Sequence, residues 1–160
     1  MRFPDVRHSK GFTLLEILLV MGILVIISAM SFSTYTSYRV NVEADEEMNK
    51  IRSILHDARG RAIAFEQNSQ WGVRFSNPVA TDPIYELFQG SSYPGIIKET
   101  VYLSSRFMFI APAVGMVQDV IFQKRSGKST NASTITISIG PRGGGLSMIS
   151  TTITQAGKIE

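Results

Sequence analysis

The sequence predicts an α+β fold in which one long N-terminal helix continues into a globular head of antiparallel β-strands. No proline occurs between Phe12 and Gln70, and the apolar residues in the second half of this stretch recur with helical spacing. After Gln70 the apolar residues alternate with polar ones, which is typical of half-buried strands. A chain of 160 residues has room for one compact domain beside such a helix.

The first part of the predicted helix, residues 12–32, is an apolar segment. Its interruptions are Thr13, Glu16, Gly22, Ser28 and Ser31. As a helix this segment would be about 31 Å long, which matches the hydrocarbon core of a bilayer. Arg2, Arg7 and Lys10 precede it, and Arg39 follows it. This distribution predicts a single membrane crossing with the N-terminus in the cytoplasm and the rest of the chain outside.

Glu16 lies inside this apolar segment, where a carboxylate costs roughly 2.5–3.5 kcal/mol at the centre of a bilayer. A cleavable secretory signal would use Ser28-Ala29-Met30-Ser31 as a weak cleavage site, but the apolar run is longer than in such signals. A plain signal anchor fits the length and leaves Glu16 unexplained. The residues around Glu16 offer a third interpretation.

The stretch Lys10-Gly11-Phe12-Thr13-Leu14-Leu15-Glu16 resembles the type III signal of type IV pilins and type II secretion pseudopilins. The family pattern is a basic leader, a glycine, phenylalanine or methionine, a small hydroxyl residue, two aliphatic residues and a glutamate. The resemblance implies that prepilin peptidase cuts between Gly11 and Phe12 and methylates the new amine of Phe12. It also implies that Glu16 pairs with this amine on a neighbouring subunit, or with the Phe12 amine of its own subunit before assembly, which would compensate a buried charge.

The predicted organisation has three parts: a leader peptide at 1–11, a long helix at 12–65 with its membrane half at 12–32, and a β-rich head at 66–160. The resemblance implies a precursor in the bacterial inner or cytoplasmic membrane, with the head outside the cytoplasm. It further implies assembly into an envelope filament with other major and minor pilin or pseudopilin subunits.

The second half of the helix carries an apolar stripe that we expect to pack on the head. The stripe consists of Met48, Ile51, Leu55, Ala58, Ala62 and Phe65. Strands are predicted at 71–75, 84–88, 99–103, 107–111, 117–123, 134–139 and 147–154. This arrangement resembles the GspH/FimT-type minor pseudopilins, as do Ser53-Ile54-Leu55-His56-Asp57-Ala58-Arg59, Trp71-Gly72-Val73-Arg74-Phe75 and the ending Gly157-Lys158-Ile159-Glu160.

The sequence offers little for catalysis or metal binding. It has no cysteine, which excludes disulfides and thiol chemistry. His8 lies in the leader, and the adjacent His56 and Asp57 do not share a helix face. The acidic residues at 43, 45, 46 and 47 are spread around a helix, whereas a calcium site needs converging oxygens. We therefore expect no catalytic residue, no metal and no cofactor. A membrane-anchored enzyme would need convergent polar groups in a pocket of the head.

Lys124, Arg125, Lys128 and Arg142 form a predicted basic tip that could contact nucleic acid. The FimT branch is associated with DNA uptake through a Gly-Arg-x-Arg pattern, whereas Arg142-Gly143-Gly144-Gly145 has a single arginine. The net charge of +3 would fall to +1 on removal of the leader, which speaks against a generally basic DNA-binding chain. The sequence thus predicts a minor pilin or pseudopilin, a structural subunit of a type II secretion pseudopilus or type IV pilus. A DNA-binding competence minor pilin is the alternative.

Overall fold

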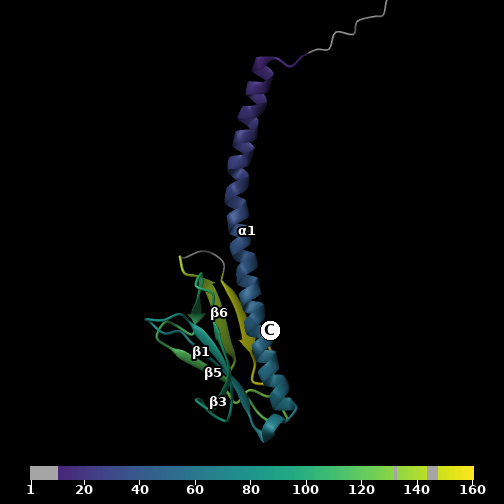
Figure 1. Cartoon of the computed structure of the whole chain (residues 1–160). Helices are drawn as coiled ribbons and strands as arrows, with labels where there is room; N and C mark the ends of the chain where they lie inside the picture. Colours follow the sequence, from purple (N-terminus) through teal and green to yellow (C-terminus); the bar gives the residue numbers. More distant parts are fainter. Residues whose placement is uncertain (1–10, 132, 144–147) are drawn as a thin grey trace, which may run out of the picture. The chain divides into compact units, whose positions relative to one another are not determined.

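The computed structural model describes residues 11–131, 133–143 and 148–160, without the side chains of residues 30–34, 36 and 37. Its elements are α1 (Leu14–Ile63), η1 (Glu66–Asn68), β1 (Trp71–Ser76), β2 (Ile84–Gln89), β3 (Ile96–Tyr102), β4 (Phe107–Ala111), β5 (Val117–Phe122), β6 (Ile135–Pro141) and β7 (Ile149–Ile153) (Figure 1). The chain divides after Arg39 into two compact units. The predicted α+β class, a helix followed by antiparallel strands, is confirmed.

The first unit contains the start of α1. Thr13 precedes the helix, and its carbonyl accepts the first helical hydrogen bond from the Ile17 N–H at 3.2 Å. From Leu14 to Ala29 the side chains of this part of α1 are exposed. Among the described residues, no helix combines the length and the apolarity that a membrane crossing requires. The predicted crossing at 12–32 stays a prediction.

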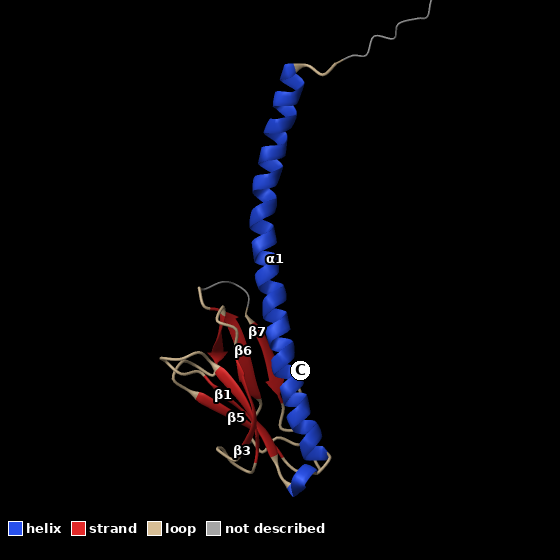
Figure 2. Ribbon diagram, in the orientation of Figure 1, coloured by secondary structure: helices blue, strands red, loops and turns tan. Residues whose placement is uncertain are grey.

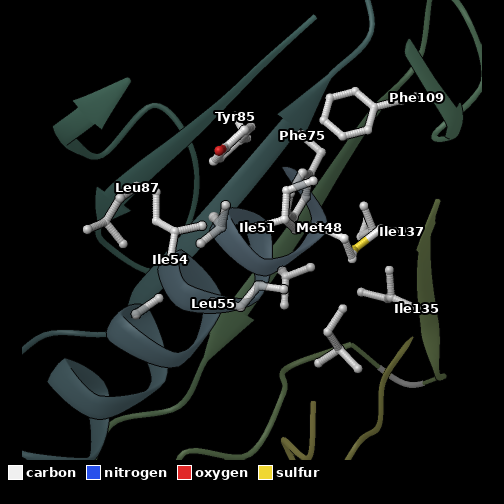
Figure 3. Packing of buried hydrophobic residues seen from close by; sticks show 14 of the residues in the cluster. Met48, Ile51, Ile54, Leu55, Phe75, Tyr85, Leu87, Phe109, Ile135 and Ile137 are labelled. Carbon is white, nitrogen blue, oxygen red and sulfur yellow. The ribbon is translucent and has the colours of Figure 1, made fainter. Parts of the chain in front are cut away.

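The second unit consists of the β-rich head together with α1 from Val40 onward. Here the predicted stripe is buried, and Met48, Ile51 and Leu55 are fully inaccessible. Figure 3 shows these three side chains in the same cluster as Phe75 of β1 and Ile137 of β6. Phe65, the last predicted stripe residue, is only half-buried because α1 has already ended at Ile63. The core therefore lies between one face of α1 and the two sheets.

The seven strands form two antiparallel sheets (Figure 2). The order is β3-β2-β1-β5 in the first and β4-β6-β7 in the second. β3 begins at Ile96, before the predicted start at residue 99, because a register shift opposite Leu87 and Phe88 lets Ile97 pair with Phe88. β6 ends at Pro141, two residues beyond the predicted end at residue 139, and Pro141 pairs with Phe107 at the end of the ladder. The predicted start of the last strand, residue 147, lies outside the described residues.

The loop after β5 closes the C-terminal end of α1. The Arg125 N–H donates to the Ala62 carbonyl at 2.8 Å, which satisfies one of the free carbonyls at the helix end. Trp71 is fully buried beside this end: its Nε1 donates to the Glu66 carbonyl at 3.3 Å, and Arg61 lies 5.0 Å from its ring centroid. These contacts hold the end of the helix on the start of β1.

Candidate functional site

The Gly11–Phe12 peptide bond lies in an irregular, exposed segment directly before α1. Phe12 is 79% exposed. A Cβ built on Gly11 would meet no atom within 4 Å. Nothing in the described part of the chain covers this bond, so a protease that must approach the backbone closely has access to it.

Thr13 forms the N-cap of α1. Its Oγ1 accepts a hydrogen bond from the Glu16 backbone N–H at 3.2 Å. Thr13-Leu14-Leu15-Glu16 has the spacing of a capping box, in which a hydroxyl residue caps the helix and a glutamate follows three residues later. The exposed Glu16 also stands in the first helical turn, where a negative charge interacts favourably with the helix dipole. The capping role of Thr13 was missed in the sequence analysis, although the Thr-x-x-Glu spacing is a signal that could have found it.

A family profile, the prokaryotic N-terminal methylation motif, matches residues 6–32. The fold is similar to that of the type IV minor pilin FimU of Pseudomonas aeruginosa strain PAO1. The crystal structure of FimU in space group P21 has a TM-score of 0.56 and 15% identity, with 74% of this chain and 87% of that chain covered. In space group P65 the values are 0.51 and 16%, with coverage of 72% and 90%. No curated protein sequence matches this chain.

The chain thus carries the N-terminal methylation motif at residues 6–32 and has a pilin-like α+β fold. The motif covers the segment from which the sequence analysis drew its resemblance, and the solved structures share the fold of helix and head. The similarity to FimU at this identity concerns the fold.

The four basic residues of the predicted tip do not form one cluster. Lys124 and Arg125 lie at the helix end, where Arg125 stacks 4.4 Å from the Phe65 ring centroid; Lys128 follows in the same loop. Arg142 forms an ion pair of 2.7 Å with Asp82.

The two groups lie at opposite ends of β1. Lys124 follows Phe122, which pairs with Trp71 at the start of β1, whereas Asp82 precedes Ile84, which pairs with Ser76 at its end. A strand of this length spans about 17 Å. The glycine run after Arg142 extends into residues 144–147, outside the described residues.

The other candidate residues of the sequence analysis also lie apart. His56 is exposed, and Asp57 forms an ion pair of 2.8 Å with Arg61. Among the acidic residues, Glu43 binds Arg106 at 2.7 Å and the buried Glu47 binds Lys50 at 2.8 Å. Within the described residues, no three metal-binding side chains converge.

We call a groove on the second unit the β3 groove. It has a volume of about 390 Å³ and lies between α1 and the strands β2 and β3. Lys50, Ser53 and Asp57 line it from α1, Tyr85 from β2, and Glu99 and Val101 from β3. The sequence pattern does not indicate this groove, because strand alternation identifies the faces of a strand and not the space beside it.

Proposed function

We propose that this chain is a minor pilin or pseudopilin whose precursor is cut by prepilin peptidase between Gly11 and Phe12 and methylated on Phe12. The observation that carries the proposal is the exposed Gly11–Phe12 bond, placed directly before a Thr13-capped helix within the matched methylation motif. The new N-terminus would lie one residue before the helix cap. Cleavage would therefore leave α1 with its cap intact.

The parts of the precursor have different tasks in this proposal. Residues 1–11 are the leader, residues 12–65 the assembly helix, and residues 66–160 the head. Leu14, Leu18 and Val25 are among the exposed apolar side chains of the first unit, and such a surface is stable in lipid or against other apolar helices. We place 12–32 in the bacterial inner membrane before assembly, with the head outside the cytoplasm, and in the interior of an envelope filament afterwards.

Glu16 is the proposed assembly residue. In an apolar filament interior its carboxylate would be costly unless it met a positive charge. Cleavage creates such a charge at the amine of Phe12, so each processed subunit brings both partners of an ion pair. A neighbouring subunit shifted along the filament axis would bring its Phe12 amine to Glu16.

The work of the head is structural in this proposal and needs no catalytic residue, metal or cofactor. Its partners are the peptidase, the membrane and other major and minor subunits. The DNA-binding alternative requires one basic cluster, and its support is weaker because Arg142 is paired with Asp82 at the other end of β1 from Lys124 and Arg125.

The processing step can be tested by co-expression with prepilin peptidase and mass spectrometry of the product. The wild-type chain should begin at N-methylated Phe12. Glu16→Ala should be cut normally and fail to enter filaments. Glu46→Ala, which removes an exposed carboxylate farther along the same helix, should be cut and incorporated. An uncut wild-type chain would refute the proposal.

The filament can be identified by deleting the gene and scoring one strain for exported enzymes and for DNA uptake. Loss of secretion with normal uptake indicates a type II pseudopilus. Loss of uptake with normal secretion indicates a type IV pilus, and charge reversal at Arg125 and Arg142 would then test the DNA-binding alternative. Normal secretion together with normal uptake would contradict a role in either machine.

A further inference from the structure

Three of the four sheet edges in the described head are covered by the chain itself. Along β5, the Thr130 N–H donates to the Ile121 carbonyl at 2.8 Å. Along β7, Glu160 and Thr152 exchange two backbone hydrogen bonds of 3.0 Å. On β4, the Phe109 carbonyl accepts a hydrogen bond of 2.9 Å from the side chain of Asn77. Such covering is expected, because an open edge invites pairing with other strands.

The fourth edge, β3, has no such cover in the part of the chain that the structure describes. β3 pairs with β2 alone. The Leu103 N–H donates to the Pro83 carbonyl, just beyond the last pair of this ladder, at 2.9 Å. Since backbone groups in an antiparallel ladder alternate between the two sides, Tyr102 and Thr100 direct theirs away from β2. The backbone groups of these two successive outward positions therefore have no partner among the described residues.

The side chains of β3 make this edge suitable for a protein partner. Ile96, Ile97 and Tyr102 are 59%, 44% and 70% exposed. Lys98 and Glu99 are its charged residues, and an edge strand with so few charges is weakly protected against pairing. β3 thus offers both free backbone groups and apolar contact area.

The β3 groove beside this edge carries negative charge. Lys50 and Asp57 at its border have ion-pair partners of their own, Glu47 and Arg61. The exposed Glu99 carboxylate has no ion pair with any described residue. Burial, together with the nearby Glu47 and Glu99, raises the pKa of Tyr85 to about 12, as expected where an additional negative charge is unfavourable. A positive side chain would be complementary to the groove.

We propose that β3 accepts an extended segment of a filament subunit of different sequence as a fifth strand of its sheet, and that this segment places a lysine or arginine in the β3 groove beside Glu99. The proposal rests on the proposed function in one respect: the partner is a subunit of the same filament. Backbone pairing supplies the affinity, and the groove selects the side chain, as in other cases of strand addition.

The backbone part of the proposal can be tested at Tyr102. Tyr102→Pro removes the outward N–H, and proline is tolerated at an open edge. Tyr102→Ala removes the exposed side chain and keeps the N–H, so it is the matched control. We expect incorporation into filaments to fall about fivefold for the proline variant relative to the alanine variant, the effect of one hydrogen bond. Equal incorporation of the two variants would overturn strand addition.

The charge part of the proposal can be tested with Glu99→Lys. Lys98→Glu is its control, because Lys98 is the neighbouring residue and does not line the groove. Glu99→Lys should reduce incorporation about tenfold, since it would place like charges together, while Lys98→Glu should retain it. An equal loss in both variants would contradict a specific site at Glu99.

Hydrogen exchange separates failure of this inference from failure of the proposed function. Measured by mass spectrometry on residues 96–102 of the full chain, exchange should be at least about tenfold slower in filaments than in detergent-solubilised subunits. Incorporation with unchanged exchange would overturn the inference and leave the proposed function standing, whereas a processed chain that never enters filaments would overturn both. The chain has no cysteine, so in a Tyr102→Cys variant a disulfide can form only between two copies of this chain. A disulfide-linked homodimer in filaments would show that a second copy occupies the β3 edge and would overturn the proposal.

Discussion

The guanidinium carbon of Arg74 lies 3.6 Å from the centroid of the Tyr93 ring, so the loop between β2 and β3 is held against the sheet by a cation over an aromatic face. Asp119 accepts two hydrogen bonds of 2.6 and 2.7 Å from the same guanidinium and thereby fixes it. The Tyr93 hydroxyl donates in turn to Glu86 at 2.9 Å. The four residues form a polar chain across three strands and one loop.

Removing the Asp119 charge from this series of polar contacts should destabilise the head. Asp119→Asn removes the charge that binds Arg74, and we expect a loss of about 1–2 kcal/mol in the free energy of unfolding, measured by urea denaturation. Asp82→Asn is the control, because the Asp82–Arg142 pair is more exposed and should contribute less than about 1 kcal/mol. An equal loss in the two variants would contradict a special role for the Arg74 site.

The stability of the head should fall between pH 10 and pH 12 because of Tyr85. Burial raises the pKa of Tyr85 from 10.0 to about 12. The folded state therefore keeps a proton that the unfolded state loses, so this contribution is complete below pH 10 and lost as the pH approaches 12. For Tyr85→Phe, the free energy of unfolding should decline less steeply with pH across this range, because about one proton fewer is released on unfolding. Denaturation measured at several pH values would show the difference. Tyr102→Phe, at an exposed position, should decline like the wild type.

The cap at Thr13 should control the first turn of α1. Thr13→Ala should cost about 1 kcal/mol of local stability, which corresponds to about fivefold faster exchange of the Glu16 amide hydrogen. Thr13→Ser keeps the accepting hydroxyl and should exchange like the wild type. Nuclear magnetic resonance of the chain in detergent would measure both rates, and unchanged exchange in Thr13→Ala would show that the hydroxyl is not the cap.

Alanine substitution of two glycines near the end of α1 should change the stability of the head in opposite directions. A Cβ at Gly60, inside the helix, would meet no atom within 4 Å, so Gly60→Ala should stabilise the head by roughly 0.5–1 kcal/mol. Gly127 has a φ of +62°, and a Cβ there would lie 2.7 Å from the Ile63 side chain. Gly127→Ala should therefore destabilise the head by more than about 1 kcal/mol. Thermal unfolding of the two variants checks both signs.

Local sequence pattern was sufficient for the helical stripe as far as Ala62 and for the approximate position of every described strand. Met48, Ile51 and Leu55 are buried because helical spacing places them on one face. Alternation does not determine which strands pair, so the division into two sheets could not be read from it. The early start of β3 depends on a register shift between β2 and β3, and the covering of β7 is a single bridge between Ile153 and Ile159 without any periodic pattern.

The candidate site divides in the same way. The residues of the signal, from Gly11 to Glu16, are contiguous, so their relation is visible in the sequence. The relation of Arg142 to Lys124 is a matter of three-dimensional structure: they belong to opposite ends of a strand from which both are distant in sequence. They were predicted to form one basic tip because the sequence shows their charges and not their positions in the fold.

The position of Trp71 supplies a built-in optical reporter. It is the sole tryptophan of the sequence, and it is fully buried between the end of α1 and the sheet. Its emission should shift to longer wavelength when water reaches the indole, so opening of this junction can be followed without attaching a dye. Spectra of free and assembled subunits would thereby reveal whether entry into a filament loosens the contact between helix and head.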